Sequence, residues 1–307
     1  MEFRLLMMSA MYENGGNTVH RFFDGHPQMF VYPFESQLGT SMVQDHLTLM
    51  YPVKYRWPSF GLDATSLQDY RAIIDEECKV RARTPCVSKF RDMPFEFNDD
   101  ARCNIFTELV QDKGRSTGNN VAAFFEATFE AWKDYRRTGQ EKVYVGYSPI
   151  VVVDAERILR DLSNAHVLQV VRNPWSAYAD TKKRPVPLSL ERYMTCWTTN
   201  QYHALVFKKI YPDRISIIRY EDVIMSPKAS LEKICGLLGI QSSDSLEAPT
   251  WNGNLLQEVY PWGTIRRASE EANKATANEL SRREMEAVRN WAGHYLEIFD
   301  YKSFVSG

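Results

Sequence analysis

The chain has 307 residues, of which 44% are hydrophobic and 25% are charged, a composition typical of a globular protein with enough apolar material for a core. Its net charge of −2 offers no general basic surface for nucleic acid, so an anionic ligand needs local cations or backbone amides. The five cysteines have no C-x-x-C spacing, which gives no support to a zinc or redox site, and their odd number favours a reducing compartment.

The first apolar stretch, residues 3–11, predicts a buried strand. Residues 5–11 could alternatively be the core of a short signal peptide, but Glu2 and Arg4 precede this segment and no cleavage site of small residues follows before Tyr12. No apolar run reaches the ~18 residues that cross a bilayer. We therefore expect a cytoplasmic protein.

Helices and strands alternate along the rest of the chain. A helical pattern at 18–23 and a short strand at 29–32 follow the first loop, and residues 41–137 are predicted to be mostly helical, most clearly at 68–83 and 121–137. The remaining predicted strands are 142–147, 166–171 and 214–219; the remaining helices are 150–162, 177–183, 190–210, 229–238, 270–280 and 282–299, with a polar irregular loop at 241–264.

Strands separated by helices predict an α/β fold, with a central parallel sheet flanked by helices and joined by right-handed crossovers. We expect a single domain over 1–307, with a helical insertion at about 41–137 and a C-terminal loop and helices at 241–307. Ligands of such sheets bind beyond the carboxyl ends of the strands. Residues 12–18, 172–184 and 220–222 are predicted to lie there.

The first of these segments contains Asn14-Gly15-Gly16-Asn17-Thr18. Its glycines let the backbone close around an anion, and free amides at the start of the following helix add positive potential. The alternative is an ordinary strand-to-helix turn capped by Thr18. The loop has no lysine, and Glu13 stands where a cation is expected.

The other two segments add cations and an aromatic ring. An apolar strand brings Arg172 to the edge of the sheet, and the arginine fork suits a phosphate. The cations at 182–184 follow one helix later, although the end of a helix attracts cations without any ligand. Tyr220, at the end of another strand, is suited to contact a flat base, while Glu221 and Asp222 read as a capped helix start.

The three segments, in this order, resemble sulfotransferases that use 3′-phosphoadenosine 5′-phosphosulfate (PAPS). The third segment carries the resemblance on through RYEDVIMSPKASLEKICGLLGI, residues 219–240. The resemblance implies a P-loop-like nucleotide-binding fold and an enzyme that moves a sulfuryl group from PAPS to a hydroxyl or amine of a polar small molecule or carbohydrate. The product nucleotide is 3′-phosphoadenosine 5′-phosphate (PAP), and no metal is required.

The resemblance also assigns residues, with two departures. Glu13 replaces the loop cation of the family, and Asp180 replaces a serine eight residues after the arginine that binds the 3′-phosphate, although Thr181 beside it offers a hydroxyl. We expect Glu13 to face the acceptor side and to favour a cationic or hydrogen-bond-donating substrate. A carboxylate at this position is also tolerable if it pairs with a nearby cation. The residues assigned to the nucleotide are Asn14, Gly15, Gly16, Asn17, Thr18, Arg172, Asp180, Arg184, Tyr220 (adenine contact), Arg266 and Arg267 (a loop over PAPS).

Sulfuryl transfer needs a base for the acceptor proton and positive charge for the leaving phosphate. Glu35, shortly after the predicted strand 29–32, is our candidate for the base, with His20 and His26 as rivals. Two other functions are alternatives to a sulfotransferase. One is a PAPS-binding protein without catalysis. The other is a P-loop kinase, which would need the motif G-x-x-x-x-G-K-[ST], and the absence of the lysine counts against it. The candidates for the leaving-group cation are Arg21, Arg56, Lys182 and Lys183.

Overall fold

A computed structural model of the chain describes residues 2–257 and 267–305. Its centre is a five-stranded sheet in the order β2-β3-β1-β4-β5, and every neighbouring pair is parallel. This confirms the predicted α/β class. The strands are β1 (Leu5–Ala10), β2 (Met29–Val31), β3 (Val143–Tyr147), β4 (Ala165–Val171) and β5 (Ile215–Arg219).

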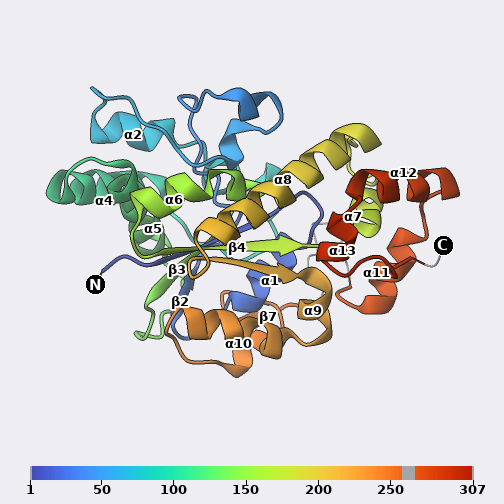
Figure 1. Ribbon diagram of the computed structural model, residues 1–307. Helices are drawn as coiled ribbons and strands as arrows, with labels where there is room; N and C mark the ends of the chain where they lie inside the picture. The colour runs from blue at the N-terminus through green and yellow to red at the C-terminus, as the bar shows by residue number, and fades with distance from the viewer. Residues whose placement is uncertain (1, 258–266, 306–307) are drawn as a thin grey trace.

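Both faces of the sheet are buried under helices, which explains why β1 is buried throughout and apolar at every position except Ser9. Leu5 and Met7 belong to the core on one face, whereas Leu6 and Met8 belong to the core on the other, because side chains alternate along a strand. In Figure 1 the first face lies under α5 (Thr117–Ala131), α6 (Ala155–Asp161) and α8 (Leu190–Ile210). The second face lies against α1 (Gly16–Phe23) and α10 (Pro227–Leu237).

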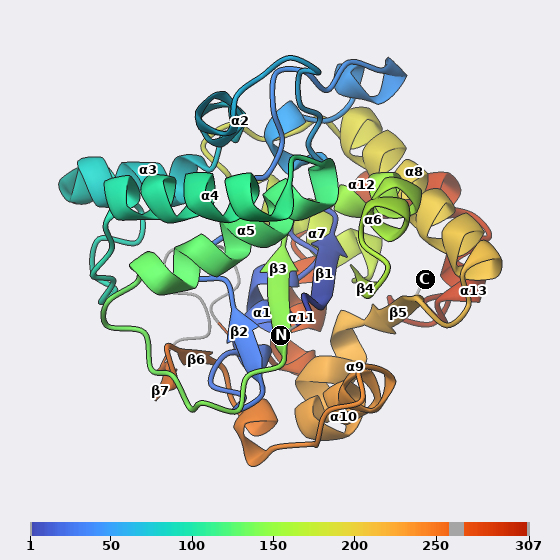
Figure 2. The ribbon, with the colours of Figure 1, turned by 90° about the vertical axis from the view of Figure 1, so that its left-hand side faces the viewer.

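The insertion between β2 and β3 is helical, as predicted, but its boundaries differ from the expectation. The predicted helix 68–83 is two helices, because Asp75 adopts a left-handed φ of 36° between them. The predicted helix 121–137 begins earlier and ends at Ala131. The helices before α5 are α2 (Ser66–Ala72), α3 (Glu76–Arg83) and α4 (Asp99–Lys113), which Figure 2 shows stacked above the sheet.

A third apolar core lies beyond the carboxyl end of β4 and includes Trp175, Trp197 and Val288. The predicted helix 282–299 is two helices. The helix start expected at Glu221 and Asp222 is confirmed, one residue earlier, by a short helix that begins at Tyr220. The elements of this end of the molecule are α7 (Pro174–Thr181), α9 (Tyr220–Met225), α11 (Glu270–Ala277), α12 (Arg282–Ala292) and α13 (Tyr295–Ile298), and the small hairpin of β6 (Thr250–Trp251) and β7 (Asn254–Leu255) lies on the far side. Among the described residues, none of the helices combines the length and apolarity needed to cross a membrane.

Candidate active site at the carboxyl edge of the sheet

The strand order places the predicted site residues in a row. Glu35 follows β2, Tyr147 ends β3, the glycine loop follows β1, Arg172 follows β4 and Tyr220 follows β5. The glycine loop is therefore central. The candidate base lies on one side of it, and the residues expected to bind the nucleotide lie on the other (Figure 2 shows the strand order).

The glycine loop leaves the amino end of α1 open. Gly15 is the N-cap of α1, has a φ of 79°, and provides no side-chain cap. A Cβ atom at Gly15 would collide with the ring of Tyr220, and one at Gly16 would collide with the ring of Tyr147. Two tyrosine rings thus flank a bare backbone whose first amides carry the positive end of the helix dipole, an arrangement suited to an anion.

Asn14 holds this loop in place. Its Oδ1 accepts hydrogen bonds from the backbone N–H of Arg172 (3.0 Å) and from Trp197 Nε1 (3.2 Å), and its Nδ2 donates to the Tyr193 hydroxyl (3.1 Å) and the Tyr12 carbonyl (3.0 Å). The side chain is completely buried. Asn14 therefore connects β1, β4 and α8. Both polar atoms of its side chain bind protein groups, so the side chain has a structural role.

Arg172 is buried and engaged with protein groups. Its Nη1 donates to Asp180 Oδ2 (2.7 Å) and to the carbonyl oxygen of Glu13 (2.8 Å), and its Nε donates to Asn273 Oδ1 (2.8 Å). The guanidinium carbon lies 5.2 Å from the centre of the Tyr220 ring. The structure thus brings Arg172, Asp180 and Tyr220 together, and the carboxylate that replaces the family serine neutralises the arginine.

Glu13 pairs with Arg184, the second outcome that the sequence allowed. Arg184 Nε lies 3.8 Å from Glu13 Oε1, and its guanidinium covers the ring of Tyr12 at 5.0 Å. About a third of the Arg184 side chain is exposed. A partly exposed cation therefore stands at the mouth of the glycine loop, where the loop itself lacks one.

Glu35 is tied to the glycine loop. Its side chain is 8% exposed, and Asn17 Nδ2 donates to its Oε1 at 3.2 Å. Its backbone N–H donates to Glu77 Oε2 at 3.2 Å. The candidate base and the start of α1 are thus held at a fixed separation by Asn17.

Glu77 and Lys89 complete the cluster, and neither was singled out from the sequence. They form an ion pair. Burial opposes the charge of Lys89, but Glu77 and Glu35 outweigh it and raise the pKa of Lys89, while the charge of Arg184 acts in the opposite direction. Glu77 lies on α3 and Lys89 in the loop after it, with no motif that marks either.

The electrostatics of Glu77 predict a pH-dependent stability. Burial first, and then the charge of Glu35, raise the pKa of Glu77 from 4.5 to about 7. The folded state then binds this proton more tightly than the unfolded chain does, so the free energy of unfolding should fall as the pH rises from about 4.5 to about 7. Over that pH interval the loss is on the order of 3 kcal/mol.

Urea unfolding at pH 5 and pH 8 measures this loss. Between the two pH values, the free energy of unfolding of Glu77→Gln should fall by less than that of the wild type. The difference between the two falls should be at most on the order of 3 kcal/mol. Glu76→Gln removes a neighbouring carboxylate that is 57% exposed and should behave like the wild type. Equal losses in the wild type and Glu77→Gln would contradict the raised pKa.

The rival bases lie in less suitable places. Burial, and then the charge of Arg21, lower the pKa of His20 well below its usual range, and its Nδ1 lies 2.9 Å from Arg21 Nη2. His26 lies at the opposite edge of the sheet, where its Nε2 bonds to the carbonyl of Gln241 at 3.0 Å. His20 packs near Tyr147, with ring centres 5.8 Å apart, and so remains the nearer of the two to the glycine loop.

The four cations proposed for the leaving group all have carboxylate neighbours. Arg56 binds Asp45 and Asp154 in the interior. Lys183 contacts a predicted site residue, because its Nζ lies 3.0 Å from Asp180 Oδ1. The other pairs are Arg21 with Asp24 (3.7 Å) and Lys182 with Glu284 (2.7 Å). Arg184 and Lys89 have carboxylate partners too, but their partners are Glu13 at the glycine loop and Glu77, which contacts the backbone of Glu35.

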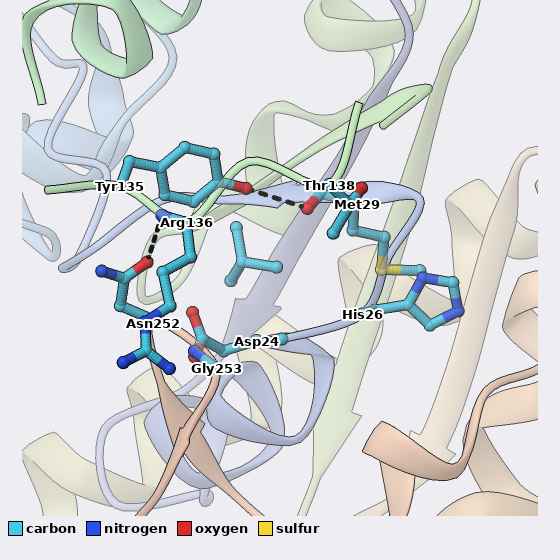
Figure 3. Close-up of a pocket in the computed structure, with 10 residues that line it drawn as sticks. Asp24, His26, Met29, Tyr135, Arg136, Thr138, Asn252 and Gly253 are labelled. Carbon is cyan, nitrogen blue, oxygen red and sulfur yellow. Dashed lines mark hydrogen bonds between the residues drawn. The ribbon is translucent and has the colours of Figure 1, made fainter. Parts of the chain in front are cut away.

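The structure gives little information on the loop that was predicted to cover PAPS with Arg266 and Arg267. Arg266 lies outside the described residues, and Arg267 is exposed. A pocket of about 140 Å³ is lined by Asp24, His26 and Asn252, among others, and is shown in Figure 3. It lies at the amino end of β2, so it is separate from the carboxyl edge that carries the candidate site.

Comparison with known proteins identifies the family. A sulfotransferase family model matches residues 15–244. No curated protein sequence matches the chain. Similar solved structures include the sulfotransferase domain of the Synechococcus PCC 7002 olefin synthase (14% identity, 95% of this chain and 88% of that one, TM-score 0.48) and sulfotransferase STF9 from Mycobacterium avium (14%, 98% and 78%, 0.48). A sulfotransferase from Alicyclobacillus acidocaldarius is also similar (13% identity, 94% and 96%, TM-score 0.39). With the family match running from the glycine loop past the end of α10, the chain belongs to the sulfotransferase family.

Proposed function

We propose that the protein transfers a sulfuryl group from PAPS to a hydroxyl or amine of a polar small molecule or carbohydrate. The observation that carries the proposal is the position of the glycine loop, with an uncapped helix start, between Tyr220 on one side and Glu35 on the other. Family membership supplies the class of reaction. The arrangement supports nucleotide binding on the Tyr220 side of the loop and proton transfer on the Glu35 side.

The phosphosulfate is held at the start of α1. The amides of residues 15–18 face it, and the absence of side chains at Gly15 and Gly16 lets the rings of Tyr220 and Tyr147 pack directly against the loop. Arg184 and Lys89 provide the positive charge that the loop lacks and that stabilises the leaving phosphate. The adenosine lies on the β4–β5 side, next to Tyr220.

Glu35 takes the proton in the transfer step. The acceptor oxygen or nitrogen forms a bond to sulfur while the bond from sulfur to the bridging phosphate oxygen breaks, and PAP leaves with that electron pair. The acceptor proton passes to the Glu35 carboxylate, which Asn17 orients. Holding Glu35 to the loop fixes the approach of the acceptor relative to the bond that breaks.

The acceptor side of the site is aromatic and acidic. Tyr12 and Tyr55 meet edge to face, with ring centres 5.9 Å apart, and the charge of Glu35 acts on both. Burial is the main cause that raises the pKa of each tyrosine, so both hydroxyls stay protonated and can donate. Rings with polar tips beside Glu35 and Glu77 suit an acceptor with several hydroxyl or amino groups.

Transfer of radioactive sulfur from labelled PAPS to a panel of polyols, amino sugars and amines tests the proposal. We expect label in at least one class of acceptor and release of PAP in equal amount. Binding of PAP without transfer to any of them would favour the non-catalytic alternative. Transfer of the γ-phosphate of ATP would instead point to a kinase.

A further inference from the structure

The ion pair between Arg172 and Asp180 occupies the position that the resemblance assigns to the 3′-phosphate of the donor. Both side chains are almost fully buried, at 2% and 3% exposure, and their nearest atoms are 2.7 Å apart. Lys183 binds the other oxygen of Asp180 at 3.0 Å. The chain thus carries its own anion where family members are expected to receive one.

The surroundings hold this pair in place. Asn273, on α11, accepts a hydrogen bond from Arg172 Nε and donates one to Glu221 Oε1 at 2.9 Å. The Ser176 hydroxyl donates to the Asn273 carbonyl at 2.7 Å, which fastens α11 to α7. Arg172 therefore has little freedom to turn away from Asp180 toward a ligand.

A 3′-phosphate brought to this place would meet a buried carboxylate. Like charges at short range in a site removed from water repel strongly, and a phosphate monoester carries close to two negative charges at neutral pH. A ribose 3′-hydroxyl has a proton to donate, and a carboxylate has lone pairs beyond those that Arg172 and Lys183 use. The chemistry at Asp180 therefore favours a hydroxyl over a phosphate.

We infer that Asp180 stands in for the 3′-phosphate and that the donor site accepts adenosine 5′-phosphosulfate, with a free 3′-hydroxyl, at least as well as PAPS. This inference rests on the proposed function and refines its donor. The bonds made and broken at sulfur are the same, and the nucleotide that leaves is adenosine 5′-phosphate. Asp180 is then the residue that sets the donor specificity.

Calorimetric titration of the wild-type protein with adenosine 5′-phosphate and with PAP decides the point. We expect adenosine 5′-phosphate to bind as tightly as PAP, within about threefold, or more tightly. PAP binding 30-fold more tightly, or better, would overturn the inference and leave the sulfotransferase proposal standing. Failure of both nucleotides to bind would reject the proposed donor site itself. Initial rates with labelled adenosine 5′-phosphosulfate and labelled PAPS should show the same order.

Variants of Asp180 test its role directly. Asp180→Ser, which restores the hydroxyl of the family, should tighten PAP binding at least tenfold while leaving adenosine 5′-phosphate within threefold. Glu279→Gln is the matched control, because Glu279 binds Lys183 at 2.9 Å but does not contact Arg172, and its ratio should equal that of the wild type. Asp180→Asn serves as a second neutral variant, and an unchanged ratio in a folded variant would contradict the assignment. The wild-type ratio stands as the deciding measurement if neither variant folds.

Discussion

Replacing Glu35 with glutamine should lower turnover by roughly 10²–10⁴-fold, the contribution typical of a positioned general base. The amide keeps an oxygen for the hydrogen bond from Asn17 Nδ2, so the start of α1 and the loop should keep their positions. Nucleotide affinity should therefore stay within twofold of the wild type. Turnover at saturating donor and acceptor, together with calorimetry for the nucleotide, measures the two effects separately.

A comparison with Glu76→Gln separates a base from a general effect of charge. Glu76 begins α3 and pairs with Lys54 at the surface, so its loss should leave turnover within twofold of the wild type. Turnover of Glu35→Gln within threefold of the wild type would make Glu35 a bystander. His20→Gln would then be the next variant, since His20 is the rival that lies nearer to the glycine loop.

The five strands of the central sheet were predictable from their local patterns, whereas the two-residue strands β6 and β7 lie within 241–264, which was predicted to be an irregular loop. The apolar runs at 3–11 and 166–171 are β1 and β4, and both are buried on two faces of the sheet. The helix over 190–210 was predicted with its observed bounds from its amphipathic pattern, and in the structure Ser189 caps its start and Tyr211 is its C-cap. The break in the predicted helix 68–83 was not predictable from its periodicity. It depends on Asp75, whose left-handed conformation is maintained by contacts with residues far along the chain.

The site was only partly accessible to sequence reasoning. The glycine loop, Arg172 and Tyr220 could be located because each ends a strand or begins a helix in an order typical of the family. Glu77 and Lys89 lie in the insertion, where no motif marks them, and they reach Glu35 only through the tertiary fold. The sequence indicated that Asp180 would repel a phosphate. Its ion pair with Arg172 could not be predicted, because it depends on how α7 packs beside the end of β4.

The insertion is joined to the site through a buried network around Arg102. This arginine, on α4, binds Asp75 at 2.7 Å and Asp99 at 2.8 Å, and the Tyr32 hydroxyl donates to Asp75 at 3.0 Å. Tyr32 follows β2, three residues before Glu35, and Asp75 precedes α3, two residues before Glu77. The network therefore fixes the two elements that bring the carboxylates of Glu35 and Glu77 together.

Replacing Arg102 with methionine should destabilise the protein by about 3–5 kcal/mol, because it leaves Asp75 as an uncompensated charge with no exposed surface. Chemical denaturation measures the loss, and the double variant with Asp75→Asn should recover part of it, since the buried charge is then absent. Arg83→Ala, which removes an arginine that is 66% exposed and pairs with Asp99, should cost less than about 1 kcal/mol.

Arg102→Met should also reduce turnover at temperatures where it remains folded, because Glu35 and Glu77 lose their common support. A variant within 1 kcal/mol of the wild type and with full turnover would show that the insertion holds its place without this ion pair, and that the carboxylates owe their positions to the packing of Phe34 against Phe90 instead.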